Sequence, residues 1–302
     1  MERYINCIAH KTSEGNLLAG DEYTALFDCG MAYCADRTIQ NVKKALKNRP
    51  GKHGLLGKPS LSLDYLFITH THYDHIGSLP FLRKTWPLLR IVTSQTGADI
   101  LLKDTPRRVI RELSVIAANK CNVQIDTAYS DDAFHADVIV KDNDIIPLGG
   151  VSVKTLETPG HTRDSLSFFI PELELLIVSE TAGFMTPDGI LYPTYLTSVN
   201  DTINSIEKLK NMPYKFLSFP HRGIADEKDT DGFFDKALKA VIDCRDFILD
   251  MNDKKLDKEA MFENYVQKYG NEKLLAYQPW DAFAVNARAT IACTLREFAP
   301  NG

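Results

Sequence analysis

The 302-residue sequence predicts an α/β domain over residues 1–225 and an all-helical cap over residues 226–302. In the first part, short apolar runs typical of strands alternate with stretches of helical periodicity, which favours layered α/β structure. From about residue 226 onward, apolar residues recur at three- and four-residue steps, which indicates amphipathic helices. Hydrophobic residues make up 44% of the chain and charged residues 25%, a composition that can bury a sizeable core.

Strands are predicted where apolar runs end in turn residues or in polar side chains. They fill much of residues 1–30, where the run YTALFDCG gives way to a turn. Residues 136–180 contain several consecutive strands, which requires antiparallel pairing. Two of the strands in that run cover residues 165–170 and 173–180. Outside it, strands are expected at residues 63–70, 89–94 and 215–221.

Helices are predicted from one-sided apolar patterns and from residues typical of helix ends. Ile39, Val42 and Leu46 share one face of a helix over residues 36–48. Pro106 suits the first turn of a helix that runs to residue 120. Further helices are expected at residues 76–87, 96–104, 233–251, 257–269 and 280–298. The Gly- and Pro-rich residues 49–60 predict a loop.

The composition argues against several classes of function. The formal net charge is −5, and residues 226–273 hold 13 acidic and 9 basic side chains, so neither the chain nor its cap is suited to bind nucleic acid. No apolar run approaches the roughly 20 residues of a membrane span. The first residues lack the pattern of a signal peptide. Six scattered cysteines without a CxxC pair predict reduced thiols in a cytoplasmic protein.

The stretch LFITHTHYDHIGSLP, residues 66–80, carries metal-ligand side chains where an apolar run ends: His70, His72, Asp74 and His75. Such a cluster buries no apolar surface and needs polar partners, so it predicts metal binding. In an extended chain, His70 and His72 point to the same side. A turn after them would direct Asp74 and His75 to a second point, which suggests two metal ions.

Three more polar residues follow apolar strands in the same way: His161, Glu180 and His221. Because strand ends can meet at one edge of a sheet, these three are the candidates for the remaining ligands. A single histidine at a strand end is more often an ordinary structural residue. That interpretation is kept for His10, His53 and His135.

Four motifs resemble those of the metallo-β-lactamase superfamily and occur in the family's order: FDCG, THTHYDHIG, TPGHTRDS and SFPHRG. They extend over about residues 20–225. The resemblance implies a four-layer αβ/βα metallo-β-lactamase sandwich, with the metals at the edge between two β-sheets. It also implies a metal-dependent hydrolase, to which this chain adds the C-terminal all-helical cap.

The resemblance also implies how the ligands divide between two divalent metal ions. His70, His72 and His161 would hold one ion, and Asp74, His75 and His221 the other. The family's bridging carboxylate is an aspartate, but the motif VSETAG places Glu180 there. The longer side chain would bridge both ions, bind only one, or change their spacing.

A narrower resemblance is to the quinolone signal response branch, whose members resemble 2-aminobenzoylacetyl-CoA thioesterases. It includes the chain length, the run ITHTHYDHIGSLPFL, the helix-rich insert at residues 96–120 and the helical tail. Nitrogen and oxygen ligands are compatible with zinc, iron or manganese. The branch favours iron and the superfamily favours zinc.

The function predicted from these observations is hydrolysis of a small thioester, ester or lactone through attack by metal-bound hydroxide. Asp74 is the candidate proton acceptor. The expected partners are an acyl or aryl substrate, with a coenzyme A thioester as one option, and a second copy of the chain in a homodimer. The alternative is a non-catalytic or weakly catalytic regulatory protein. The net negative charge disfavours a nuclease. His72 disfavours a flavin-linked diiron oxidoreductase, because that branch carries glutamate at this position.

Outer contacts and a substrate pocket are also predicted. Metal-binding histidines need partners that orient their rings, and the candidates are Asp28, Asp164, Thr162 and Ser165. Aromatic and apolar residues near the metals would line an acyl or aryl pocket. The candidates are Phe184, Met185, Tyr192, Tyr195, Tyr277, Trp280 and Phe283, although docking of the cap helices is the more common role for any single one of them.

Overall fold

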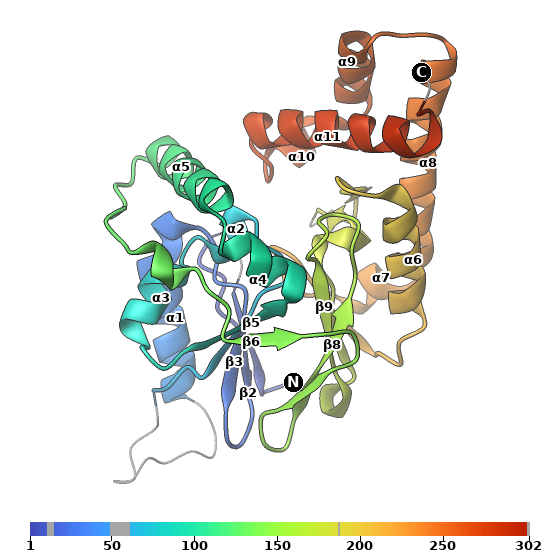
Figure 1. The fold of residues 1–302 in the computed structure, drawn as a ribbon. Helices are drawn as coiled ribbons and strands as arrows, with labels where there is room; N and C mark the ends of the chain where they lie inside the picture. The colour runs from blue at the N-terminus through green and yellow to red at the C-terminus, as the bar shows by residue number, and fades with distance from the viewer. Residues whose placement is uncertain (11–14, 49–60, 187, 301–302) are drawn as a thin grey trace, which may run out of the picture.

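Two six-stranded β-sheets face each other at the centre of the computed structural model, with helices on the outer face of each (Figure 1). The structure describes residues 1–10, 15–48, 61–186 and 188–300. The loop predicted at residues 49–60, with His53, lies outside the described residues. The two sheets and their helices form the predicted four-layer αβ/βα sandwich, so the fold class is confirmed.

The first sheet has the strand order β1-β2-β3-β4-β5-β6. The strands are β1 (Tyr4–Asn6), β2 (Asn16–Ala19), β3 (Thr24–Phe27), β4 (Tyr65–Phe67), β5 (Arg90–Ser94) and β6 (Val138–Val140). β1 to β3 pair antiparallel, and β3 to β6 pair parallel. The antiparallel prediction for residues 136–180 is therefore wrong for β6. The long helical connection from β5 allows β6 to return parallel.

The second sheet has the order β14-β13-β10-β9-β8-β7. Its strands are β7 (Ile145–Pro147), β8 (Ser152–Glu157), β9 (Leu166–Ile170), β10 (Leu175–Ile177), β13 (Phe216–Phe219) and β14 (Gly223–Ile224). β7 to β10 form the antiparallel run that was predicted, and β10 pairs parallel with β13. A separate two-stranded ribbon joins β11 (Phe184–Met185) to β12 (Leu191–Tyr192).

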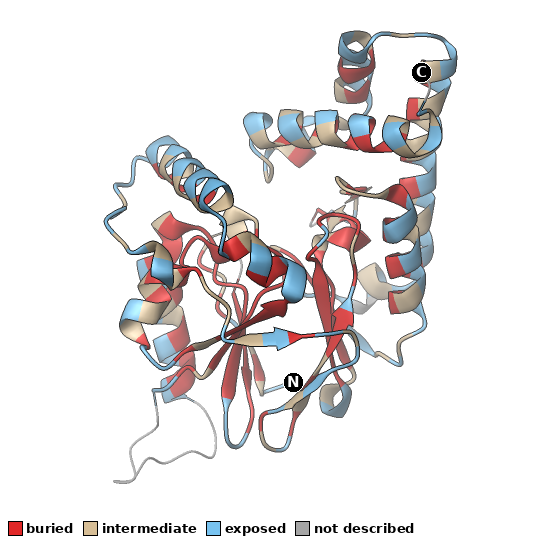
Figure 2. Ribbon diagram, in the orientation of Figure 1, coloured by how far each residue is buried: buried red, intermediate tan, exposed pale blue. Residues whose placement is uncertain are grey.

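Alternating side chains explain the layers. Leu26 and Leu66 are buried on the outer face of the first sheet, whereas Phe27 and Phe67 point between the sheets. There Phe27 packs on Phe168 of the second sheet with ring centroids 5.2 Å apart. Figure 2 shows the buried strands in red at the centre of the molecule. Apolar contact between the two sheets thus fixes their spacing and brings their edges together.

Helices cover both outer faces. On the side of the first sheet lie α1 (Ala35–Lys47), the short α2 (Tyr73–Ile76), α3 (Leu79–Thr85), α4 (Gln95–Leu101) and α5 (Asp104–Lys120). On the side of the second sheet lie α6 (Val199–Lys210) and α8 (Phe233–Asp253). Helix α6 was not predicted. Its signals are the Ser198 cap, which accepts a 3.0 Å hydrogen bond from the Asp201 amide, and the buried Ile206 and Leu209.

The C-terminal region is helical, as predicted. It contains α7 (Glu227–Thr230), α8, α9 (Lys258–Tyr269), α10 (Glu272–Leu275) and α11 (Trp280–Phe298). One apolar core joins this region to the second sheet, because Leu217 of β13, Val241 of α8 and Ile291 of α11 belong to the same buried cluster. None of the described helices combines the length and apolar content that a membrane crossing requires. The division at residue 225 stays a prediction.

Candidate metal centre

All seven predicted ligands lie at the edge where the two sheets meet. β4 ends at Phe67, three residues before the predicted end at His70, so His70 and His72 both lie in the loop after the strand. In this loop the Thr69 backbone N–H donates to the Asp28 carboxylate at 2.8 Å. His161 follows β8. Glu180 begins the short 3₁₀ helix Glu180–Ala182 after β10, and His221 lies between β13 and β14.

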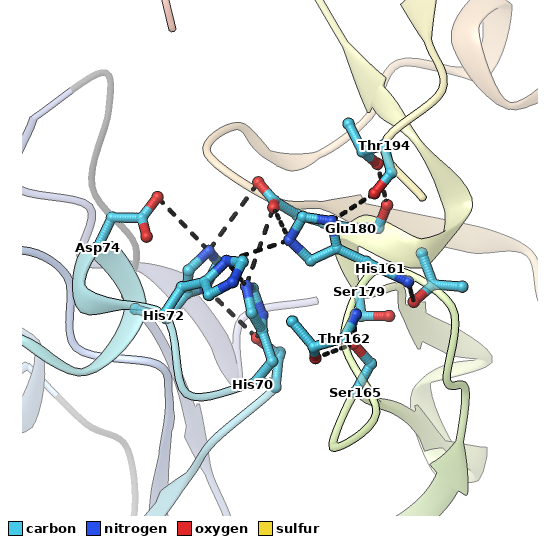
Figure 3. Close-up of polar contacts among 12 residues, drawn as sticks. His70, His72, Asp74, His161, Thr162, Ser165, Ser179, Glu180 and Thr194 are labelled. Atoms are coloured by element: carbon cyan, nitrogen blue, oxygen red, sulfur yellow. Dashed lines mark hydrogen bonds and ion pairs between the residues drawn. The ribbon is translucent and has the colours of Figure 1, made fainter. Parts of the chain in front are cut away.

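His70, His72, His161 and Glu180 form the first group of ligand atoms. Nδ1 of His72 lies 3.0 Å from Nε2 of His70 and 3.2 Å from Nε2 of His161. Oε2 of Glu180 lies 2.8 Å from Nε2 of His161. Figure 3 shows these side chains converging, His70 and His72 from the first sheet and His161 and Glu180 from the second.

Asp74, His75 and His221 form the second group, with one ligand atom from each inside a 4.8 Å cluster. Oδ2 of Asp74 lies 3.9 Å from Nε2 of both histidines. The other oxygen of Glu180, Oε1, lies 2.9 Å from Nε2 of His221. The Glu180 carboxylate therefore touches one group with each of its oxygens.

These groups fit metal ions. Ligands at 2.0–2.1 Å from a tetrahedral zinc ion are about 3.3 Å apart, close to the spacing within the first group. Nε2 of His75 is buried and has no hydrogen-bond partner among the described residues. A buried ring nitrogen without a partner is costly unless a ligand completes it. The donor set of imidazoles and carboxylates suits zinc, iron or manganese.

Asp28 orients a histidine of the second group. It lies in the turn after β3 with φ of 54°, a conformation that aspartate tolerates better than most residues. Its Oδ2 accepts hydrogen bonds from the Thr69 hydroxyl at 2.6 Å and from Nδ1 of His75 at 2.8 Å. The bond to Nδ1 turns Nε2 of His75 toward the centre, as a metal ligand requires.

The other predicted outer contacts are less direct. The Asp164 carboxylate accepts the Thr71 backbone N–H at 2.9 Å and so holds the loop between two ligands. Thr162 and Ser165 bond each other at 2.7 Å and have no described bond to a ligand ring. The ring of His161 instead donates from Nδ1 to the carbonyl oxygen of Thr194. The sequence analysis missed both Thr194, which acts through its backbone carbonyl, and Thr69, which acts through its backbone N–H and its hydroxyl.

Burial keeps two ligands of the first group neutral. Burial and the neighbouring imidazoles hold the pKa of His70 well below its usual range. Burial and His161 lower the pKa of His72 to about 4. Burial alone would raise the pKa of Glu180, but His161 and His221 outweigh it and keep this carboxyl ionised. Neutral imidazoles and an anionic carboxylate are the forms that bind metal.

His75 has the opposite shift. Burial alone would lower its pKa, but the Asp28 and Asp74 carboxylates outweigh burial and raise the pKa to about 10. In the metal-free protein at pH 8, His75 therefore carries a proton that a metal ion must displace. Zinc binding at pH 8 should release about one proton from this residue. Asp28→Asn removes the charge that raises the pKa, so the release should decrease.

Calorimetric zinc titrations in buffers of different ionisation enthalpy measure this proton release. The matched control is Asp99→Asn, which changes an exposed carboxylate on α4. An equal release from the wild type and from Asp28→Asn would contradict the assignment of the proton to His75.

A cavity of about 540 Å³ opens onto the centre. Its floor includes His72, Asp74, Glu180 and His221, and its walls are mostly apolar. Of the predicted pocket residues, four line it: Phe184, Tyr192, Tyr277 and Phe283. Three are not among its lining residues: Met185, Tyr195 and Trp280.

The prediction missed the opposite wall of the cavity. Leu113 and Ile116 of α5 line that wall, although both are exposed on the helix. Across the mouth, Lys120 at the end of α5 forms an ion pair with Asp281 of α11. The cavity therefore lies between the first-sheet helices and the C-terminal helices.

Comparison with known proteins agrees with the fold and the motifs. The model of the family described as "Metallo-beta-lactamase superfamily" matches residues 16–221. The Metallo-beta-lactamase fold-containing protein ST1585 of Sulfurisphaera tokodaii is 26% identical over 205 residues, which cover 65% of this chain and 72% of that protein. A Hydroxyacylglutathione hydrolase of Bartonella tribocorum is 24% identical over 167 residues, which cover 55% of this chain and 51% of that protein. The chain thus matches only about half of the second relative.

Solved structures share the fold as well. The metallo-beta-lactamase family protein TTHA1429 from Thermus thermophilus superposes with a TM-score of 0.62 at 15% identity. The superposition covers 98% of this chain and 93% of that chain, so the likeness in fold extends into the helical C-terminal region.

Proposed function

Because this chain belongs to the metallo-β-lactamase superfamily, we propose that it is a dinuclear metal-dependent hydrolase of a small thioester, ester or lactone. The observation that carries the proposal is the position of Glu180. Its two oxygens contact His161 at 2.8 Å and His221 at 2.9 Å, at the base of an apolar cavity. One carboxylate between two sets of nitrogen ligands supports a site for two ions.

Two bound divalent ions, zinc or iron with manganese as a third choice, would supply an activated water and polarise the substrate carbonyl. The residues of the chain do the rest. The cavity orients the carbonyl carbon over His72, Asp74 and Glu180. Asp74 takes the proton of the attacking water as the new C–O bond forms, and delivers it to the sulfur or oxygen that leaves as the C–S or C–O bond breaks.

The cavity favours an acyl or aryl group as the buried half of the substrate. The rings of Phe184 and Tyr277 are tilted by 49° with their centroids 6.1 Å apart, and Phe184 lies 6.2 Å from the ring of His221. Among the described lining residues, Lys120 is the single lysine or arginine, and it is paired with Asp281. A highly charged leaving group, such as coenzyme A, would therefore extend out through the mouth.

The relatives support a thioester as the first choice. Hydroxyacylglutathione, which one relative's name gives as its substrate, is a thioester. The resemblance to the quinolone signal response branch favours an aryl thioester of coenzyme A. A homodimer is proposed as a further partner.

A substrate panel tests the function. The metal-free protein, reloaded with Zn²⁺ or Fe²⁺, should hydrolyse at least one aryl or acyl thioester of coenzyme A or glutathione faster than the matched esters and lactones.

In the same assay, Asp74→Asn should reduce kcat by about a hundredfold or more, the usual size of a general acid–base contribution. Product thiol, measured with a chromogenic disulfide, is the readout for thioesters, and release of acid is the readout for esters and lactones. If the fully metal-loaded protein turned over none of the thioesters, esters and lactones, the proposal would be wrong and the alternative of a regulatory binding protein would be supported.

A further inference from the structure

A second, very small cavity lies behind the metal centre, between the two sheets. Its volume is about 10 Å³, and its polar lining residues are Asn16 of β2, Asp28, Thr69 and Ser218 of β13. A space of about 10–15 Å³ holds one water molecule when two to four polar groups surround it. The size and the lining both meet that condition.

The polar groups around this cavity have unused hydrogen-bonding capacity. Asn16 is 3% exposed, and its Oδ1 is buried without a hydrogen-bond partner among the described residues. The Asp28 carboxylate can accept about four hydrogen bonds. The bonds described for it come from the Thr69 amide, the Thr69 hydroxyl and His75. One acceptor position on Asp28 therefore remains for a donor from the cavity.

Ser218 supplies the complementary group. Its hydroxyl lies 2.9 Å from the phenol of Tyr4 in β1. When Tyr4 donates to Ser218, the Ser218 hydroxyl keeps its own proton for another acceptor. A water in the cavity can accept that proton and donate its two hydrogens, one to Oδ1 of Asn16 and one to the free acceptor position of Asp28.

We propose that this cavity holds one ordered water, and that Asn16 and Ser218 act through it as positioning residues for the metal centre. The water closes a chain from Tyr4 through Ser218 to Asp28, and Asp28 holds Nδ1 of His75 at 2.8 Å. The chain spans both sheets and holds the Asp28 carboxylate at the acceptor position that Thr69 and His75 leave free. The positioning role rests on the proposed metal binding by His75, whereas the water itself does not.

The first test is a crystal structure of the wild-type protein at about 1.5 Å resolution. The expected result is a water peak within hydrogen-bonding distance, about 2.6–3.2 Å, of Asn16, Asp28 and Ser218. An empty cavity, or an Asn16 side chain bonded to a protein group instead, overturns the proposal.

The second test measures zinc affinity by competition with a chelator. Asn16→Leu removes the acceptor and fills the cavity, so one of the two stepwise zinc affinities, that of the group with His75, should fall about three- to tenfold. Loss of a direct outer partner weakens metal binding by about 10–100-fold, and this contact is one step further away. Ser218→Ala should act in the same direction and is the second variant in case Asn16→Leu does not fold.

The matched control is Thr155→Val in β8. Thr155 also buries a hydroxyl without a described partner, but it does not line this cavity. Its substitution should leave zinc affinity within about twofold of the wild type, since its side chain has no described contact with a ligand or with a partner that orients one. Equal zinc affinities for Asn16→Leu, Ser218→Ala and the wild type overturn the positioning role. A wild type that binds none of zinc, iron and manganese overturns that role together with the proposed function, while the crystal structure still decides on the water.

Discussion

Replacing His161 with alanine should remove metal from the first group and lower kcat/KM for the best substrate by about a thousandfold. A metal ion that polarises a carbonyl contributes several kcal/mol to transition-state stabilisation, and about 4 kcal/mol corresponds to this factor. His161 is buried, contacts His72 at 3.2 Å and Glu180 at 2.8 Å, and is the first group's one histidine from the second sheet. Its removal would leave the first group without a histidine from the second sheet.

Elemental analysis of the purified variant, alongside kcat/KM, measures both effects. The control is His135→Ala, which removes a half-exposed histidine outside the centre and should retain wild-type metal content. A His161→Ala protein with two bound ions and an activity within about tenfold of the wild type would contradict the ligand assignment.

The proximity of the first four candidate ligands could be predicted from the sequence because its signal is local. His70, His72, Asp74 and His75 fall within six positions, so their proximity follows from covalent geometry alone. The proximity of His161 and His221 depends on the pairing of distant strands. It could be anticipated because each residue follows an apolar strand, because strand ends meet at one edge, and because the motifs around both residues resemble those of the superfamily.

Other parts of the site could not be predicted, for reasons that are physical. Thr194 contributes a backbone carbonyl, which every residue type possesses, so its bond to His161 leaves no mark on the sequence. Leu113 and Ile116 line the cavity from exposed positions on α5, and their pattern suggests only one face of a helix. The strand β6 joined the first sheet because the connection through α4 and α5 was long enough, which strand propensity does not encode.

Glu180→Gln should weaken the binding of both metal ions and lower kcat/KM by about a hundredfold or more. Glutamine keeps the shape of the side chain but removes the charge that each ion would share. The loss of one charge-assisted contact at each ion is worth about 1.5–3 kcal/mol, and about 2.7 kcal/mol corresponds to a hundredfold. The two stepwise zinc affinities, measured by chelator competition, report on each ion separately. Glu259→Gln, in an exposed pair with Arg288 on the helical region, is the control.

The resemblance places Glu180 where the family carries aspartate, and it leaves three roles for the longer side chain: to bridge both ions, to bind only one, or to change their spacing. The stepwise zinc affinities distinguish these roles. A bridging carboxylate predicts that both affinities fall in Glu180→Gln, whereas a ligand of one ion predicts that a single affinity falls.

Glu180→Asp restores the charge but withdraws the carboxylate by about 1.5 Å, one C–C bond. Since Glu180 now reaches His161 and His221 at 2.8 and 2.9 Å, the shorter side chain cannot keep both contacts without a shift of the backbone. The aspartate variant should therefore recover one zinc affinity and not the other. Recovery of both would mean that the backbone adapts and that the extra methylene of Glu180 does not set the spacing of the two ions.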